Sequence, residues 1–152
     1  MESELSDLNF NSCDEAFGRI TDSKPRHFPI SGYTDSERTV VAVWYSSGTI
    51  ENSGFSGFFG RDLPGDADLR LTTDAYKSLG DIKSSNAFLE AIELISSDGK
   101  TETDRSKRTE MWKSHTVEFR KEIELRFYAG MDELMANLAK HISNSNLLPT
   151  LD

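Results

Sequence analysis

Nine residues, Asn52 to Gly60, hold three phenylalanines and three glycines. So many aromatic rings in so short a segment favour burial over a solvated loop. Phe55, Phe58 and Phe59 are spaced at i, i+3 and i+4, which places them on one face if the segment is helical. Glycine permits tight turns and close approach of backbones. The stretch therefore predicts a turn followed by a helical segment whose rings fill a core.

The remaining pattern predicts an all-α fold, a single-domain helical bundle of about six to eight helices. Thr34 and Glu37 form the Thr-x-x-Glu pattern of a capping box before the apolar run from Val40 to Tyr45. That β-branched run would also suit a buried strand. We favour a helix because of the cap and because no other segment offers a partner strand of similar character. Gly48 is expected to end this helix.

Apolar residues recur at helical spacing in residues 13–20, 69–79, 84–95, 111–129 and 131–142. The polar, acidic residues 1–11 are expected to form a frayed helix or to stay mobile, ahead of a helical domain over 12–146 and a tail over 147–152. Residues 101–110 predict either the solvated start of a long helix or a flexible link. In the long helix that follows, six residues are expected to face inward: Met111, Trp112, His115, Phe119, Ile123 and Phe127.

The chain of 152 residues has 26 acidic and 17 basic side chains and a net charge of −9. This balance disfavours direct binding to nucleic acids or to anionic membranes, although acidic charge also simply keeps a protein soluble. The single cysteine, Cys13, excludes an intramolecular disulfide and a Cys-based zinc site. No apolar run approaches the roughly 20 residues of a membrane span, and the first residues lack the pattern of a signal peptide. We expect a cytoplasmic protein.

No pattern typical of a catalytic, cofactor or metal site is found in the sequence. The three histidines, His27, His115 and His141, are far apart, and His115 is expected to be a hydrogen-bonded core residue. The segment Gly54-Phe55-Ser56-Gly57 lacks the Gly-x-Ser-x-Gly form of a nucleophile elbow. No Lys-Ser/Thr pair follows the glycines, as a phosphate-binding loop requires. We therefore predict no catalytic residue, cofactor or metal, and a protein that is not an enzyme.

Three blocks of the sequence resemble a bacterial family of unknown function that includes a DNA-mimic protein. The segment 48–59, Gly-Thr-Ile-Glu-Asn-Ser-Gly-Phe-Ser-Gly-Phe-Phe, resembles the family's Gly-x-Ile/Val-x-Asn-Gly-Gly-Phe-x-x-Tyr/Phe-Phe core. Residues 76–94 and 124–134 are similar to its next two blocks, in the same order. Ser53 stands where the family usually has a second glycine, which argues against an essential positive φ there. The signature residues in this chain are Asn52, Gly54, Phe55, Phe58, Phe59, Phe127 and Tyr128.

The resemblance implies an all-helical protein that can form a homodimer and whose acidic surface substitutes for DNA phosphates. Such a protein occupies the DNA-binding surface of a basic protein partner. The acidic excess of this chain lies mainly before residue 100, and the residues expected to bind the partner are Asp14, Glu15, Glu51, Asp62, Asp66 and Asp68.

Two alternatives remain open at the level of the sequence. The first is a small-ligand-binding or catalytic domain with a pocket beside Phe55 and Phe58, into which His115 or Glu118 would converge. The second is an immunity-like protein that neutralises a basic partner through the same kind of acidic face.

Overall fold

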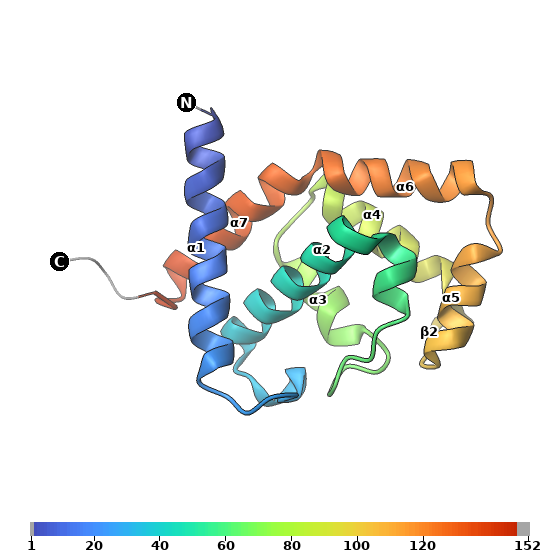
Figure 1. Cartoon of the computed structure of the whole chain (residues 1–152), viewed down its shortest axis with the longest axis horizontal. Helices are drawn as coiled ribbons and strands as arrows, with labels where there is room; N and C mark the ends of the chain where they lie inside the picture. The colour runs from blue at the N-terminus through green and yellow to red at the C-terminus, as the bar shows by residue number, and fades with distance from the viewer. Residues whose placement is uncertain (1, 149–152) are drawn as a thin grey trace.

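The computed structural model describes residues 2–148 of the chain (Figure 1). Within these residues there are seven α-helices and one small hairpin, and 72% of the residues described are helical, so the all-α prediction is confirmed. The elements are α1 (Glu2–Asp22), the 3₁₀ turn η1 (Ile30–Gly32), α2 (Asp35–Phe59), α3 (Arg70–Ser78), α4 (Lys83–Leu94), β1 (Ser96–Ser97), β2 (Lys100–Thr101), α5 (Arg105–Lys113), α6 (Val117–Ala129) and α7 (Met131–Asn144).

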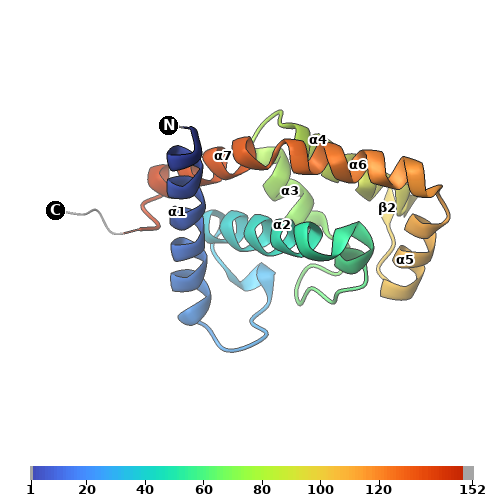
Figure 2. The same cartoon turned by 45° about the horizontal axis from the view of Figure 1, so that its top comes forward.

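Helix α2 is the central element of the bundle. It contacts α1, α3, α5, α6 and α7, while α4 packs mainly against α6. Helix α1 stands at one end of the molecule, where it crosses α2 and α7 (Figures 1 and 2). One side of α1 is therefore held by the bundle and the other side faces outward.

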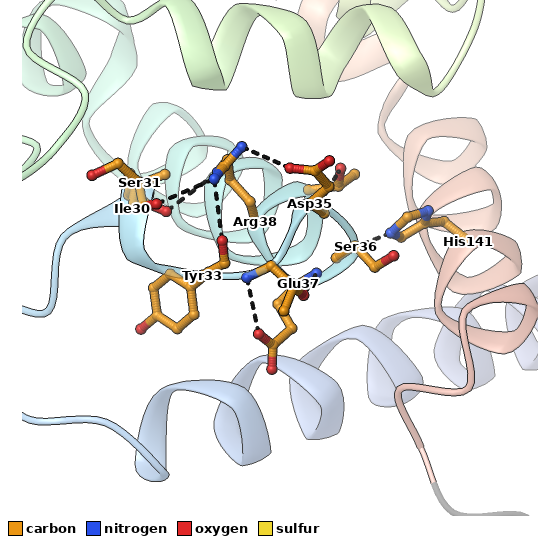
Figure 3. A network of polar contacts seen from close by, with 10 residues as sticks. Ile30, Ser31, Tyr33, Asp35, Ser36, Glu37, Arg38 and His141 are labelled. Carbon is orange, nitrogen blue, oxygen red and sulfur yellow. Dashed lines mark hydrogen bonds and ion pairs between the residues drawn. The ribbon is translucent and has the colours of Figure 1, made fainter.

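The first turn of α2 is fixed by the predicted capping box. The backbone N–H of Glu37 donates to the Thr34 hydroxyl at 3.2 Å, and the Thr34 N–H donates to the Glu37 carboxylate at 3.1 Å. Arg38, one residue further on, donates to three carbonyls of the preceding loop, those of Ile30, Ser31 and Tyr33 (Figure 3). The choice of helix over strand is confirmed, because residues 35–59 form α2, and the capping box satisfies N–H groups that a helix start leaves open.

Helix α2 does not end at Gly48, contrary to the prediction. It continues to Phe59 and changes direction at Gly54, whose φ of 69° and ψ of 179° are not helical. Gly48 is tolerated within the helix because glycine costs only about 1 kcal/mol there, less than the burial of the neighbouring apolar face gains. The predicted turn at a glycine, followed by a helical aromatic segment, is confirmed at Gly54.

Helix α6 holds both sides of this kink. The Tyr128 hydroxyl donates to the carbonyl of Ile50 at 3.1 Å, and the N–H of Phe55 donates to the Glu124 carboxylate at 3.1 Å. Glu124 therefore caps the restarted helix much as an N-cap side chain would, but from another element. A Cβ on Gly54 would collide with the same Glu124 carboxylate.

The three rings after the kink form the centre of the core, as predicted. Phe55, Phe58 and Phe59 are 0%, 1% and 0% exposed. Their ring centroids lie 5.2–6.4 Å from one another and from rings of α4, α5 and α6, in tilted or edge-to-face arrangements that favour aromatic pairs. These neighbouring rings are Phe88, Trp112 and Phe127.

The segment that follows α4 differs from its prediction. Residues 101–110 are neither a flexible link nor the start of a long helix: β1 and β2 form a hairpin around Asp98 and Gly99, both with positive φ, and Asp104 caps α5. Arg108 is only 2% exposed because its guanidinium donates to three backbone carbonyls at the end of α2 and in the following loop. The charged segment 101–110 thus contains an arginine that is buried and structural.

The predicted long helix over 111–129 is two helices. Helix α5 ends at Lys113, and Thr116 caps the start of α6 by accepting from the N–H of Phe119 at 3.2 Å. The break rotates α6 relative to α5, so that Phe119 is 37% exposed and does not face the core. His115 lies at the break, half-buried against the Phe119 ring, and not in the core as expected. Residues 2–11, in turn, are the first half of a continuous α1.

Gly54→Ala tests the kink, and Gly48→Ala in the same helix is the matched control. At Gly54 a side chain would meet both a positive φ and Glu124, so we expect a loss of about 2–4 kcal/mol in the free energy of unfolding. At Gly48 a Cβ meets nothing within 4 Å, so we expect a gain of roughly 0.5–1 kcal/mol. Urea denaturation measures both, and equal effects would contradict the assigned kink.

Candidate protein-docking surface

The outer face of α1 carries a row of carboxylates. Glu4, Asp7, Asp14, Glu15 and Asp22 are all exposed. At 100° per residue, these five positions fall within a 100°-wide stripe on one side of the helix. Between the first and last of them the helix rises by roughly 27 Å. We call these five residues the α1 ladder.

This helix holds more than half of the net charge of the chain. Residues 2–22 contain six carboxylates and one basic residue, Arg19, a net charge of −5 out of −9. Arg19 pairs with Glu15 at 3.4 Å. The other four ladder carboxylates have no ion-pair partner among residues 2–148. The ladder is therefore the strongest local concentration of negative charge on one helix.

The opposite face of α1 fixes the direction in which the ladder points. Cys13, Ala16 and Ile20 are 0–5% exposed and pack in the core. The Cys13 thiol donates to the carbonyl of Met135 on α7 at 3.6 Å, and burial raises the pKa of Cys13 to about 12. This cysteine is therefore a packing residue with no thiolate character at neutral pH.

A groove of about 480 Å³ runs beside the first half of α1, between α2 and α7. Phe10 and Trp44 form its apolar wall, with ring centroids 4.9 Å apart. Glu51 and Asp132 supply two carboxylates, and no Lys or Arg lines the groove. The Ser6 hydroxyl donates to Asp132 at 3.0 Å and ties α1 to α7 across it. The groove thus extends the acidic character of the ladder onto the bundle.

Apolar side chains are exposed at the edges of the ladder. Leu8 and Phe10, about 20° and 40° outside the stripe, are 63% and 50% exposed, and Leu5, further round the helix, is 60% exposed. A helix face that serves only to keep a protein soluble has no need of such residues, whereas docking surfaces combine apolar and charged groups. Carboxylates next to exposed apolar side chains are suited to a protein partner with both cationic and apolar groups.

Comparison with known proteins identifies the family of this chain. The family model described as DMP19-like protein matches residues 31–145. The chain belongs to the DMP19-like protein family. That family is one of DNA mimics, so membership suggests a DNA-mimic protein. No curated protein and no solved structure matches the chain.

The DMP19-like match covers η1 and helices α2 to α7, and it confirms the resemblance stated from the sequence blocks. It begins after α1, so the ladder precedes the matched part of the chain. Of the signature residues, Gly54 makes the kink, Phe127 is fully buried, and Asn52 lines the acidic groove. Ser53 has no positive φ.

The residues expected to bind a partner lie in three places. Asp14 and Glu15 belong to the ladder, and Glu51 lies in the groove. Asp62 lines a different pocket together with Lys24 and Arg26. The remaining two lie in the loop before α3: Asp66 and Asp68.

Asp66 is only 2% exposed, and its carboxylate accepts from Leu71 N–H, Thr72 N–H and the Thr72 hydroxyl at 2.6–2.9 Å. It caps α3 and is unable to reach a partner in this state. Asp68 is exposed and accepts from the N–H of Arg70 at 3.1 Å. Neither lies beside the ladder residues of α1.

Sequence reasoning missed three ladder members, Glu4, Asp7 and Asp22. Their spacing with Asp14 and Glu15 was visible, but residues 1–11 were separated from the helix over 13–20. A continuous helix across that boundary aligns all five. Reading the acidic spacing over the whole segment would have found the ladder.

The alternative of a pocket beside Phe55 and Phe58 gains no support among residues 2–148, because both rings are buried and neither lines any of the pockets described there. Within residues 2–148 there is no group of three or more His, Cys, Asp or Glu side chains arranged to hold a metal ion. None of the described helices is both long and apolar enough to cross a membrane.

Asp66 predicts a pH dependence of stability. Burial raises its pKa above the ordinary 3.8, and the hydrogen bonds from Thr72 and Leu71 offset only part of this rise. Between the ordinary pKa and the raised pKa of Asp66, the folded state retains a proton that the unfolded state has lost. The free energy of unfolding therefore falls as the pH rises between these two pKa values. We expect the wild type to lose stability relative to Asp66→Asn as the pH rises above about 4. Urea denaturation at several pH values measures this.

The exposed Asp74→Asn variant, on α3 itself, controls for the change in net charge. A wild type that gains stability relative to Asp66→Asn over the same pH range would contradict the assignment.

Proposed function

We propose that the protein is a non-enzymatic DNA mimic that occupies the DNA-binding surface of a basic protein, with the α1 ladder and the adjacent groove as its contact face. Membership of the DMP19-like family supports DNA mimicry in general. The observation that carries the specific assignment is the alignment of five exposed carboxylates, with the exposed Leu8 beside them, on one helix.

The spacing of the ladder supports phosphate mimicry. A DNA strand presents one phosphate per roughly 3.4 Å of axis, and side chains three or four apart on a helix lie roughly 5–6 Å apart. Glu4 and Asp7 form one such neighbouring pair, and Asp14 and Glu15 lie next to each other further along. A row of cationic side chains that normally contacts phosphates would meet these two pairs and Asp22, which are separated by roughly 10 Å along the helix axis.

The rigidity of the ladder supports binding without a large entropic cost. Helix α1 is held along its length by α2 and α7, by the buried Cys13 and by the bond from Ser6 to Asp132. Preorganised charges lose little conformational freedom on binding. The groove containing Glu51 and Asp132 offers a recess for one long cationic side chain of the partner, whose stem would lie against Phe10 and Trp44.

A three-residue charge variant tests the proposal. Immobilised protein captures its partner from a lysate of the source cells, and the affinity of the purified partner is then measured. We expect Asp7→Asn/Asp14→Asn/Asp22→Asn to weaken binding by about tenfold or more, since each exposed pair contributes up to roughly 1 kcal/mol. Duplex DNA is expected to displace the partner, and added salt to weaken the complex.

The matched control removes three exposed carboxylates elsewhere: Glu93→Gln/Glu110→Gln/Glu118→Gln. It has the same net charge as the ladder variant and is expected to bind almost as well as the wild type. An equal loss of affinity in both variants would mean that the ladder acts only through the net charge of the protein. A partner that binds through the ladder but is indifferent to duplex DNA would favour the immunity-like alternative over DNA mimicry.

A further inference from the structure

A second pocket, of about 540 Å³, lies where the end of α1, the loop before α2 and the loop after α2 meet. Apolar and aromatic side chains form most of its lining, among them Phe17, Phe28, Tyr33, Val41, Tyr45 and Leu63. Its volume falls in the range of about 300–1,000 Å³ that is typical of small-molecule sites. The pocket shares no lining residue with the acidic groove.

The charge around this pocket is opposite to that of the chain. Lys24, Arg26 and Arg61 line it, with Asp62 as the only lining carboxylate. Among residues 2–148 none of these three cations has a carboxylate within 4.0 Å, because the ion pairs involve other arginines. The Lys24 ammonium lies 5.1 Å from the centre of the Phe28 ring. Three uncompensated cations on an apolar pocket favour an anionic ligand with an apolar body.

The walls of the pocket are held in place without a ligand. The N–H of Ile30 donates to the carbonyl of Pro64 at 2.8 Å, which joins the loop before α2 to the loop after it. Phe28 packs edge-to-face on Tyr33, with centroids 4.9 Å apart, and its ring fills the space beside Gly32. The separate segments therefore form one preformed cavity.

We propose that this pocket binds a small monocarboxylic acid with an aromatic or aliphatic body. The apolar lining would hold the body, and Lys24, Arg26 and Arg61 would hold the carboxylate. Burial raises the pKa of the Tyr33 hydroxyl, which keeps this lining group a protonated hydrogen-bond donor at neutral pH. Asp62 offsets one of the three cations, so these four side chains have a net charge of +2 and still attract an anion. This site is separate from the proposed DNA mimicry and does not depend on it.

Three ligands with the same naphthalene body test the proposal by titration calorimetry. They are 2-naphthoate, the uncharged 2-naphthamide and the cationic 2-naphthylmethylamine. We expect 2-naphthoate, with about 13 non-hydrogen atoms, to bind with a dissociation constant between about 10 µM and 1 mM. The amide is expected to bind at least about fivefold more weakly, and the amine more weakly still.

The variant Arg26→Gln/Arg61→Gln removes two exposed rim charges. We expect it to weaken 2-naphthoate by about five- to tenfold and to leave 2-naphthamide unchanged, so that the two ligands become nearly equal. The control Arg70→Gln/Lys77→Gln removes two exposed charges from α3, outside the pocket, and is expected to retain the preference for the acid.

Four outcomes would overturn the proposal. They are equal binding of acid and amide to the wild type, tightest binding of the amine, equal loss of the acid in both double variants, and no binding of the acid at millimolar concentration. Binding of 2-naphthyl phosphate at least tenfold tighter than 2-naphthoate would also overturn the assignment to a monocarboxylate.

Discussion

The positions of the three phenylalanine rings at the centre of the core depend on one backbone break that a second helix holds in place. Gly54 turns the chain where no other residue fits, and Glu124 then accepts the N–H of Phe55 so that the helix can restart. Without the kink, a straight α2 would carry Phe55, Phe58 and Phe59 about its axis to different neighbours. Because Tyr128 also bonds to Ile50, α6 both directs the kink and packs on the rings that follow it.

The contrast between core and surface explains how much of this protein could be predicted from the sequence. The capping box at Thr34, the aromatic spacing after Gly54 and the break between the helical segments 111–129 and 131–142 are local patterns, and all are found in the structure. The prediction that the helix ends at Gly48 is wrong because glycine is compatible with both the interior and the end of a helix, and only tertiary packing decides between them. Arg108 could not be foreseen, because the three carbonyls that it binds come from residues more than 40 positions earlier.

The site was harder to predict than the fold for a similar reason. The carboxylates of α1 fall on one face only when residues 2–22 are treated as a single helix. Dividing this segment identifies Asp14 and Glu15 but misses Glu4, Asp7 and Asp22. Asp66 was chosen for its charge, yet its carboxylate serves the start of α3. Sequence composition counts carboxylates, whereas the bonds that each carboxylate makes determine whether it is available to a partner.

The charge of the chain changes sign just after α1: carboxylates lie along the outer face of the helix as far as Asp22, while Lys24 and Arg26 follow its last turn. The molecule therefore has a charge separation along this end, superimposed on its overall negative charge. Such a permanent dipole exerts a torque on an approaching cationic protein and turns it before contact. A partner that approaches from a random direction would thus be guided toward the acidic face of α1 and away from the cationic residues that follow its last turn.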